Sequence, residues 1–333
     1  MGQDFELRAC ALVAALGLGE EDEVLSVTPL TGGVSSEIAL VQLPDRQICV
    51  KFALGKLKVA AEWYAPVRRN LAEYRWLEYA AAINPDSVPQ LFGHSDELGG
   101  FAMEFVAGGE VQNWKSQLLK LPPKMAEVLA TARLLGEIHA RSVHDETIGS
   151  RFENMEDFEA LRIEPYLLSM NAMHPDIADA INVMAATLRS SRTALIHGDV
   201  SPKNVLMRGS NPILLDAECA TMADPVFDVA FCLNHFLLKA IHTPRNAAAF
   251  SEAAFGFLAE YRRFIFWERP EAFEERLAKL LPMLFLARVD GKSPVEYLDE
   301  HKQAQVRQIA RAAILKPAQD ILQLVHSVKR ELV

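Results

Sequence analysis

The sequence predicts an α+β protein made of two lobes. The N-terminal lobe, residues 1–107, should hold an antiparallel sheet and a helix, and the larger, mainly helical lobe should span residues 108–333. Short β-branched runs separated by turns occur on both sides of a predicted helix between residues 24 and 106. Apolar residues at helical spacing dominate the chain beyond them. A strand–turn–strand pattern at 205–215 interrupts the predicted helices. A chain of 333 residues is long enough for two such units.

Composition is that of a globular protein and limits the possible partners. Half of the residues are hydrophobic, and the formal net charge of −10 argues against a nonspecific nucleic-acid binder, which needs a basic face. No signal-like segment opens the sequence, and no apolar run reaches the roughly 18 residues of a membrane span. The four cysteines have no CxxC spacing and lie in apolar stretches, as reduced core residues do. We therefore expect a cytoplasmic protein without a nucleic-acid or membrane partner, and the sequence indicates no oligomeric state.

Periodicity predicts the individual elements. Helices are expected at 5–17, 67–83, 124–141, 174–190, 227–240, 250–267 and 272–288. Strands are expected at 24–27, 38–42, 47–52, 87–92 and 100–106, before the hairpin at 205–215. His139 lies in one of the apolar helices, and we interpret it as a hydrogen-bonded core residue rather than a reactive one.

Three polar side chains flank the hairpin. An apolar run ends in His197-Gly198-Asp199, Asn204 follows five positions after the aspartate, and the second strand delivers Asp216. Because a hairpin brings the chain back beside itself, we expect Asp199, Asn204 and Asp216 to lie close together.

These residue types suit phosphoryl transfer. That reaction needs a carboxylate to accept the proton of the attacking hydroxyl, and oxygen ligands to hold Mg²⁺ against the triphosphate. Asp199 is the candidate base, and Asn204 and Asp216 are the candidate metal ligands. The alternative is that all three are ordinary loop residues that cap turns. The spacing of the three residues around the two strands disfavours this alternative.

A glycine-rich turn between two predicted strands is a candidate phosphate-binding loop. Backbone N–H groups in such a loop can lie over the phosphates of ATP, although the same pattern suits a plain hairpin. The candidate residues are Gly32, Gly33, Val34, Ser35 and Ser36. The next strand carries Lys51, and either Glu73 or Glu78 of the following helix could pair with it.

These motifs resemble those of the aminoglycoside phosphotransferase and choline kinase-like enzymes, which are small-molecule kinases with the protein-kinase fold. HGDxxxxN and an apolar strand ending in aspartate match the kinase catalytic loop and metal-binding aspartate. HGD replaces HRD, and Asp216-Ala217-Glu218 replaces DFG. Within the group, the segment DAECATMADPVFDVAFCLN looks most like the D-x-E segment of methylthioribose kinases.

The resemblance implies roles for further residues. Lys51 would hold the α- and β-phosphates, and an R-x-x-x-E pattern beginning at Arg69 favours Glu73 as its partner. Glu218 would join the metal ligands, and His197 and Asp228 would support the catalytic loop. The backbone expected to bind adenine belongs to Glu104, Phe105 and Val106.

The acceptor pocket is less well defined by the motifs. Arg288 lies beside a turn in the lobe where these kinases bind the acceptor, so it either lines the pocket or fixes that turn with Asp290. Trp63 and Tyr64 either reach the acceptor or belong to the core.

The resemblance implies an ATP- and Mg²⁺-dependent kinase that phosphorylates a hydroxyl of a small molecule. We place sugar-like acceptors first, of the methylthioribose type. Because the loop Ser201-Pro202-Lys203-Asn204 departs from the threonine, glycine and serine usual in methylthioribose kinases, amino alcohols of the choline type or aminoglycosides are the alternative. Only eight residues separate Asp216 from Pro225, which leaves no room for the long regulated loop of protein-directed kinases. A nucleotide-binding pseudokinase scaffold and a nonenzymatic interaction module are the hypotheses from other classes.

Overall fold

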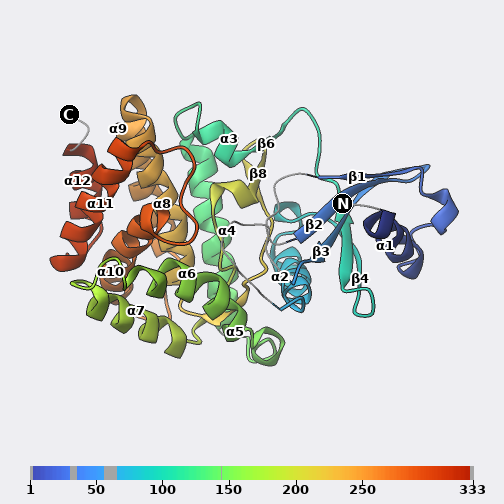
Figure 1. Cartoon of the computed structure of the whole chain (residues 1–333), viewed down its shortest axis with the longest axis horizontal. Helices are drawn as coiled ribbons and strands as arrows, with labels where there is room; N and C mark the ends of the chain where they lie inside the picture. Colours follow the sequence, from blue (N-terminus) through green and yellow to red (C-terminus); the bar gives the residue numbers. More distant parts are fainter. Residues whose placement is uncertain (1–2, 31–35, 56–65, 144, 331–333) are drawn as a thin grey trace.

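The smaller of two lobes is built on an antiparallel sheet (Figure 1). The computed structural model describes residues 3–30, 36–55, 66–143 and 145–330. The five strands follow the spatial order β1–β2–β3–β5–β4. They are β1 (Ser26–Pro29), β2 (Ser36–Gln42), β3 (Gln47–Ala53), β4 (Leu91–Ser95) and β5 (Gly100–Glu104), accompanied by the helices α1 (Gln3–Ala15) and α2 (Arg69–Ile83).

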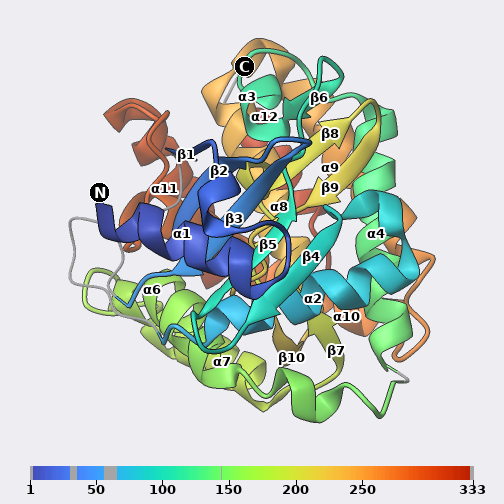
Figure 2. The same ribbon diagram turned by 90° about the vertical axis from the view of Figure 1, so that its right-hand side faces the viewer.

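The two helices cover opposite faces of this sheet because side chains alternate along each strand. Ile48, Val50 and Phe52 of β3 pack with the buried residues of α1. Cys49 and Lys51 point to the other face, where α2 lies between the sheet and the larger lobe (Figures 1 and 2). The strand alternation therefore delivers Lys51 to the region between the lobes.

The larger lobe is mainly helical and surrounds α8 (Val226–His242), which is buried along almost its whole length. The other helices are α3 (Trp114–Leu118), α4 (Met125–Val143), α5 (Met155–Phe158), α6 (Glu164–Tyr166), α7 (Ala178–Ser190), α9 (Ala247–Arg262), α10 (Pro270–Asp290), α11 (Glu300–Leu315) and α12 (Leu322–Arg330). Among the described residues, no helix is both long enough and apolar enough to cross a membrane.

Two small sheets in this lobe carry the polar motifs. The predicted hairpin consists of β8 (Val205–Arg208) and β9 (Asn211–Leu214), and β6 (Val111–Asn113) adds a third strand beside β8. Strand β7 (Ala194–Ile196), which leads into His197, pairs with β10 (Thr221–Ala223). The chain on both sides of the hairpin is thus fixed by strand pairing.

The predicted two-lobed α+β class is confirmed, and the element boundaries differ in a few places. The strand predicted at 87–92 was placed too early, because Pro85–Ser87 form a 3₁₀ turn and β4 begins only at Leu91. The side chain of Asn84 caps that turn by accepting a hydrogen bond from the backbone N–H of Asp86 at 3.2 Å, and Pro89 has no N–H to donate to a strand. The helix predicted to reach residue 267 ends at Arg262.

A close contact between α4 and the segment after α9 predicts the effect of a substitution at Gly136. A Cβ there would lie 2.5 Å from Cδ2 and 3.1 Å from Cβ of Phe264. We expect Gly136→Ala to lower the free energy of unfolding, because overpacking of about 1–3 kcal/mol exceeds the gain of up to about 1 kcal/mol in helix propensity. Urea unfolding measures this change.

The helical residue Gly256 supplies the matched control. Its added Cβ would meet Sδ of Met125 at 2.7 Å, the far part of a flexible side chain. Gly256→Ala should therefore leave stability unchanged or raise it. Equal losses in the two variants would contradict the packing argument.

Candidate active site

A buried carboxylate near the start of α8 holds the His197–Asp199 segment. Asp228 accepts hydrogen bonds from the backbone N–H groups of His197, at 2.6 Å, and Gly198, at 2.8 Å. Nε2 of His139 lies 3.2 Å from the same carboxylate, and Nδ1 lies 2.7 Å from the hydroxyl of Tyr261. Asp228 thus makes the backbone contact that the resemblance implied, and His139 is the hydrogen-bonded core residue that the sequence predicted.

The loop also depends on Gly198 and on the ring of His197. Gly198 has φ +77°, and a Cβ there would lie 2.7 Å from Cβ of Cys219, so glycine is required for two reasons. Burial lowers the pKa of His197. Its Nε2 donates to the carbonyl of Leu215 at 3.1 Å, and its Nδ1 accepts the N–H of Asp199 at 3.2 Å. The neutral ring therefore links the catalytic loop to the residue before Asp216.

Hydrogen bonds also connect the three residues predicted around the hairpin. The amide nitrogen of Asn204 donates to the backbone carbonyl of Asp199 at 3.1 Å, and the N–H of Leu215, the residue before Asp216, donates to the carbonyl of Asn204 at 2.9 Å. The amide oxygen of Asn204 is left as the atom suited to a metal ion. The hairpin therefore brings the segments of Asp199, Asn204 and Asp216 side by side.

Two cations orient the Asp199 carboxylate, and the sequence analysis identified neither. Nη2 of Arg162 lies 2.9 Å from Oδ2 of Asp199, and Nζ of Lys203 lies 3.4 Å from the same oxygen. Arg162 comes from a π-helical turn, Glu159–Ile163, and also donates to the carbonyl of Gly198. Lys203 had a local signal, since it follows Asp199 by four positions. Arg162 had none, because it is remote in sequence and lies in irregular structure.

Lys51 lies at the centre of a cluster of carboxylates. Its ammonium is 2.6 Å from Glu73, 2.5 Å from Asp216 and 3.3 Å from Glu218. Burial disfavours the charge, but the carboxylates outweigh burial and raise the pKa of Lys51 well above its ordinary value. Glu78 instead forms an exposed ion pair with Arg151 at 3.0 Å. Glu73 is therefore the partner of Lys51.

Glu218 connects three segments of the chain. Its Oε2 accepts a hydrogen bond from Nε of Arg69 at 2.9 Å, and its Oε1 accepts one from the hydroxyl of Ser36. Ser36 is the first residue of β2, and Arg69 is the first residue of α2. Glu218 thus positions parts of the smaller lobe in addition to any contact with a metal.

The acidic cluster fits a hard divalent cation. Carboxylate oxygens of Glu73, Asp216 and Glu218 all lie within 4.8 Å of one another, an all-oxygen donor set of the kind that Mg²⁺ prefers. Glu73 already contacts Lys51 and accepts the N–H of Asp216 at 3.1 Å. Although burial opposes it, the charges of Lys51 and Lys203 hold the pKa of Asp216 below its ordinary value. Asp216 and Glu218, with Asn204 nearby, are therefore the residues suited to the metal.

The structure describes only some of the residues predicted to bind the phosphates, the adenine and the acceptor. Gly32, Gly33, Val34, Ser35, Trp63 and Tyr64 lie outside the described residues. Glu104 ends β5, and its N–H donates to the carbonyl of Gln90 at 2.7 Å, while Phe105 and Val106 follow, half-buried.

Arg288 contacts the turn beside which it lies. One of its nitrogens is 3.1 Å from the hydroxyl of Tyr166 and 3.1 Å from the hydroxyl of Ser293, a residue of that turn. Asp290 is held by Arg307 at 2.6 Å and by His174 at 2.8 Å. Arg288 therefore helps to fix the turn, in agreement with one of its two interpretations from the sequence. Its contact with Tyr166 is compatible with the other interpretation, a place in the acceptor pocket.

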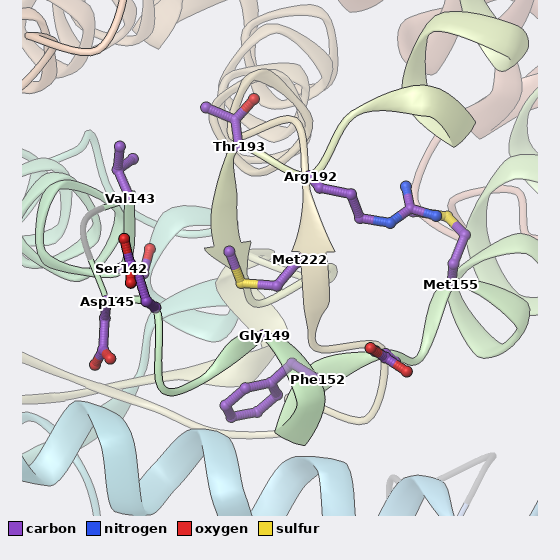
Figure 3. A pocket seen from close by; sticks show the side chains of 11 residues that line it. Ser142, Val143, Asp145, Gly149, Phe152, Met155, Arg192, Thr193 and Met222 are labelled. Atoms are coloured by element: carbon purple, nitrogen blue, oxygen red, sulfur yellow. The ribbon is translucent and has the colours of Figure 1, made fainter.

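A pocket of about 530 Å³ lies elsewhere, beside the β7–β10 pair (Figure 3). Figure 3 shows Thr193 and Met222 on the two paired strands, with Ser142 and Val143 to the left of them and Met155 to the right. None of the predicted site residues lines this pocket. It is separate from the cluster around Asp199 and Lys51.

The fold and the site together define a class. A strand lysine paired with a helix glutamate, and facing an aspartate at the end of a hairpin, is the arrangement of phosphotransferases with a protein-kinase-like fold. The chain belongs to the phosphotransferase enzyme family, whose model matches residues 26–267.

Solved structures with the same fold are kinases of small molecules. Choline kinase from Cryptosporidium parvum Iowa II superposes with a TM-score of 0.57 at 13% identity, over 99% of both chains. Choline kinase LicA from Streptococcus pneumoniae gives 0.53 at 17% identity, over 94% of this chain and 99% of that one. Amicoumacin kinase hAmiN, in complex with AMP-PNP, Ca²⁺ and Ami, gives 0.55 at 15% identity, over 95% and 97%. No curated protein sequence matches the chain.

These comparisons confirm the predicted group of small-molecule kinases. At such low identities the structural likeness shows the fold alone. The particular likeness to methylthioribose kinases stays a prediction.

The contacts of Asp228 predict a large loss of stability on its removal. Asp228→Ala would leave the buried N–H groups of His197 and Gly198 without their acceptor. We expect the free energy of unfolding to fall by about 3 kcal/mol or more, since each buried unsatisfied donor costs about 1–3 kcal/mol. Urea unfolding is the measurement, with Asp179→Ala, on the exposed side of α7, as the control. A loss below about 1 kcal/mol would show that Asp228 does not hold the loop.

Proposed function

We propose that the protein transfers the γ-phosphoryl group of Mg-ATP to a hydroxyl group of a small molecule. The observation that carries this proposal is the convergence of Lys51, Glu73 and Asp216 beside the hydrogen-bonded segment of Asp199. This set contains a cation for phosphate, oxygen ligands for a metal and a carboxylate for the acceptor proton.

Asp199 acts on the acceptor. Arg162 and Lys203 fix its carboxylate, which accepts the hydroxyl proton while the acceptor oxygen forms a bond to the γ-phosphorus. The bond from that phosphorus to the β,γ-bridging oxygen breaks, and ADP leaves with the electron pair. Protonated Asp199 then returns its proton to solvent.

The groups around Lys51 hold the nucleotide. Its ammonium, oriented by Glu73, neutralises charge on the α- and β-phosphates. Asp216, Glu218 and Asn204 would hold Mg²⁺, which when bound neutralises charge on the phosphates. The glycine-rich residues Gly32 to Ser36 cover the phosphates in this proposal, and the backbone of Glu104 to Val106 binds adenine.

Sugar-like acceptors of the methylthioribose type are our first proposal for the substrate. Amino alcohols and aminoglycosides are the alternative, supported by the choline kinase names of two similar structures. A phosphoryl-transfer screen over sugars, amino alcohols and aminoglycosides tests the proposal. A pseudokinase scaffold would bind Mg-ATP without transferring or hydrolysing it, and an interaction module would not bind it.

The proposed base gives the first kinetic prediction. Asp199→Asn keeps the size of the side chain but removes its capacity to take a proton, so we expect kcat to fall about 10²–10⁴-fold. Nucleotide affinity, measured from the thermal shift with Mg-ATP, should stay close to that of the wild type. Asp179→Asn is the control on an exposed aspartate. Turnover by Asp199→Asn within threefold of the wild type would exclude Asp199 as the base.

The two glutamates of α2 form a matched pair of variants. Glu73→Gln removes the charge that orients Lys51, whereas Glu78→Gln affects only a surface ion pair. We expect kcat/KM for ATP to fall about tenfold or more in Glu73→Gln, equivalent to about 1.4 kcal/mol of transition-state stabilisation. Glu78→Gln should match the wild type. The prediction is wrong if the two variants behave alike in steady-state kinetics.

A further inference from the structure

We propose that the acceptor carries an anionic group, a carboxylate or a phosphate, besides the hydroxyl that receives the phosphoryl group. Lys239, Arg288 and His235 form the site that binds this anion. The inference rests on the proposed transfer to a hydroxyl of a small molecule. Within the sugar-like class it selects acceptors that carry an anionic group, and it disfavours the cationic amino alcohols and aminoglycosides.

One face of α8 leads from the catalytic loop to this site. Phe231, His235 and Lys239 follow one another at intervals of four residues, which places them on one side of the helix. The guanidinium of Arg162, which holds Asp199, lies 5.8 Å from the ring of Phe231. The rings of Phe231 and His235 are 5.7 Å apart. The face of α8 that borders Arg162 therefore also carries His235 and, one turn further on, Lys239.

Lys239 is a buried cation without a hydrogen-bond acceptor. Its side chain belongs to a residue only 1% exposed, and Nζ has no hydrogen-bond partner in the part of the chain that the structure describes. It lies 5.3 Å from the centre of the Tyr297 ring. The neighbouring carboxylate of Glu296 is taken by Lys115 at 2.5 Å. A buried amine without an acceptor is costly, and its protonated form more so. An anion from outside the chain would supply the missing acceptor and favour the protonated form.

Arg288 offers a second donor to the same region. Its Nε is buried and has no acceptor among the described residues, although another of its nitrogens contacts Tyr166 and Ser293. Tyr166 lies between two guanidinium groups, 5.7 Å from that of Arg288 and 5.8 Å from that of Arg162. The same tyrosine therefore borders both the base and the proposed anion site.

The electrostatics of these residues agree with an anionic ligand. Burial, together with the charges of Lys115 and Arg288, lowers the pKa of Lys239 to about 7. Burial and the charges of Lys239, Arg288, Lys203 and Lys115 lower the pKa of His235 well below its ordinary value. An anion would relieve this mutual repulsion, whereas a cationic acceptor would add to it.

The test compares acceptors that differ in charge within a six-carbon and a three-carbon series, with choline as an additional cationic acceptor. We would measure kcat/KM with Mg-ATP for glucose, gluconate, glucose 6-phosphate and glucosamine, and for glycerol, glycerate and choline. Gluconate and glycerate test a carboxylate, and glucose 6-phosphate tests a phosphate. We expect an anionic member to exceed its neutral analogue by about tenfold or more, which is the effect of one charge-assisted contact.

Variants assign the effect to the proposed residues. Lys239→Gln and Arg288→Gln should each lower kcat/KM for the anionic acceptor about tenfold, mainly through KM, and reduce its advantage over the neutral analogue. Lys279→Gln, an exposed lysine of α10, is the matched control. Lys239→Met should also raise the melting temperature of the ligand-free protein, because it removes an unpaired buried charge. Arg288→Gln keeps the test usable if a variant at 239 fails to fold.

Binding separates this inference from the proposed function. The thermal shift with Mg-ATP reports on the kinase site, and the shift with each anion reports on the acceptor site. The inference is wrong if neutral or cationic acceptors react as well as the anionic ones. It is also wrong if no anion in the panel either reacts or stabilises the wild type more than Lys239→Gln. A protein that binds Mg-ATP but fails these acceptor tests loses only the anion site, whereas failure to bind Mg-ATP overturns the proposed function.

Discussion

The ammonium of Lys51 is the interaction on which the arrangement of the site depends. It joins the sheet of the smaller lobe to α2 through Glu73, and to the larger lobe through Asp216 and Glu218. Three carboxylates this close repel one another strongly in a buried setting, so without a central cation the 216–218 segment and α2 would separate. Arg69 adds a second positive charge on Glu218. Burial raises the pKa of Glu73 to about 7, so Asp216 and Glu218 are the carboxylates of the cluster better suited to a divalent metal.

The charge on the other side of the catalytic loop has the opposite sign. Asp199 is balanced by Arg162 and Lys203, and beyond them Lys239 and Arg288 contribute further positive charge. In the function that we propose, a metal-bound nucleotide and an acceptor would therefore meet electrostatic fields of opposite sign. The acidic side would favour the cation that accompanies the phosphates, and the basic side would favour an acceptor with a further negative charge.

The sequence predicted those parts of the site whose signals are local. The residues from His197 to Asp216 lie around one hairpin, so their proximity could be inferred from their spacing. Periodicity placed Lys51 on a strand and left both Glu73 and Glu78 as possible partners, and only the resemblance to the kinase group favoured Glu73, which is the residue that contacts Lys51. Arg162 could not, because it reaches Gly198 and Asp199 from an irregular turn remote in sequence. Lys239 and His235 lie in a strongly apolar helix and fit an ordinary core pattern. Their importance follows only from knowing which face of α8 borders the catalytic loop.

The packing of Gly198 explains why the guanidinium beside Asp199 comes from a distant segment, whereas the second cation, Lys203, is local. A side chain at 198 would collide with Cβ of Cys219, and the backbone there has a positive φ, so the arginine of HRD kinases has no room at this position. Arg162 supplies a guanidinium from outside the loop, and its contacts with Gly198 and Asp199 tie the π-helical turn to the base. The same guanidinium lies near Tyr166 and Phe231, which border the proposed anion site. If Asp199 is the base and the anion binds as we propose, Arg162 links the two sites, since the guanidinium that contacts Asp199 also lies near Tyr166 and Phe231. A change in the charge of the acceptor site would then also affect the position of the Asp199 carboxylate.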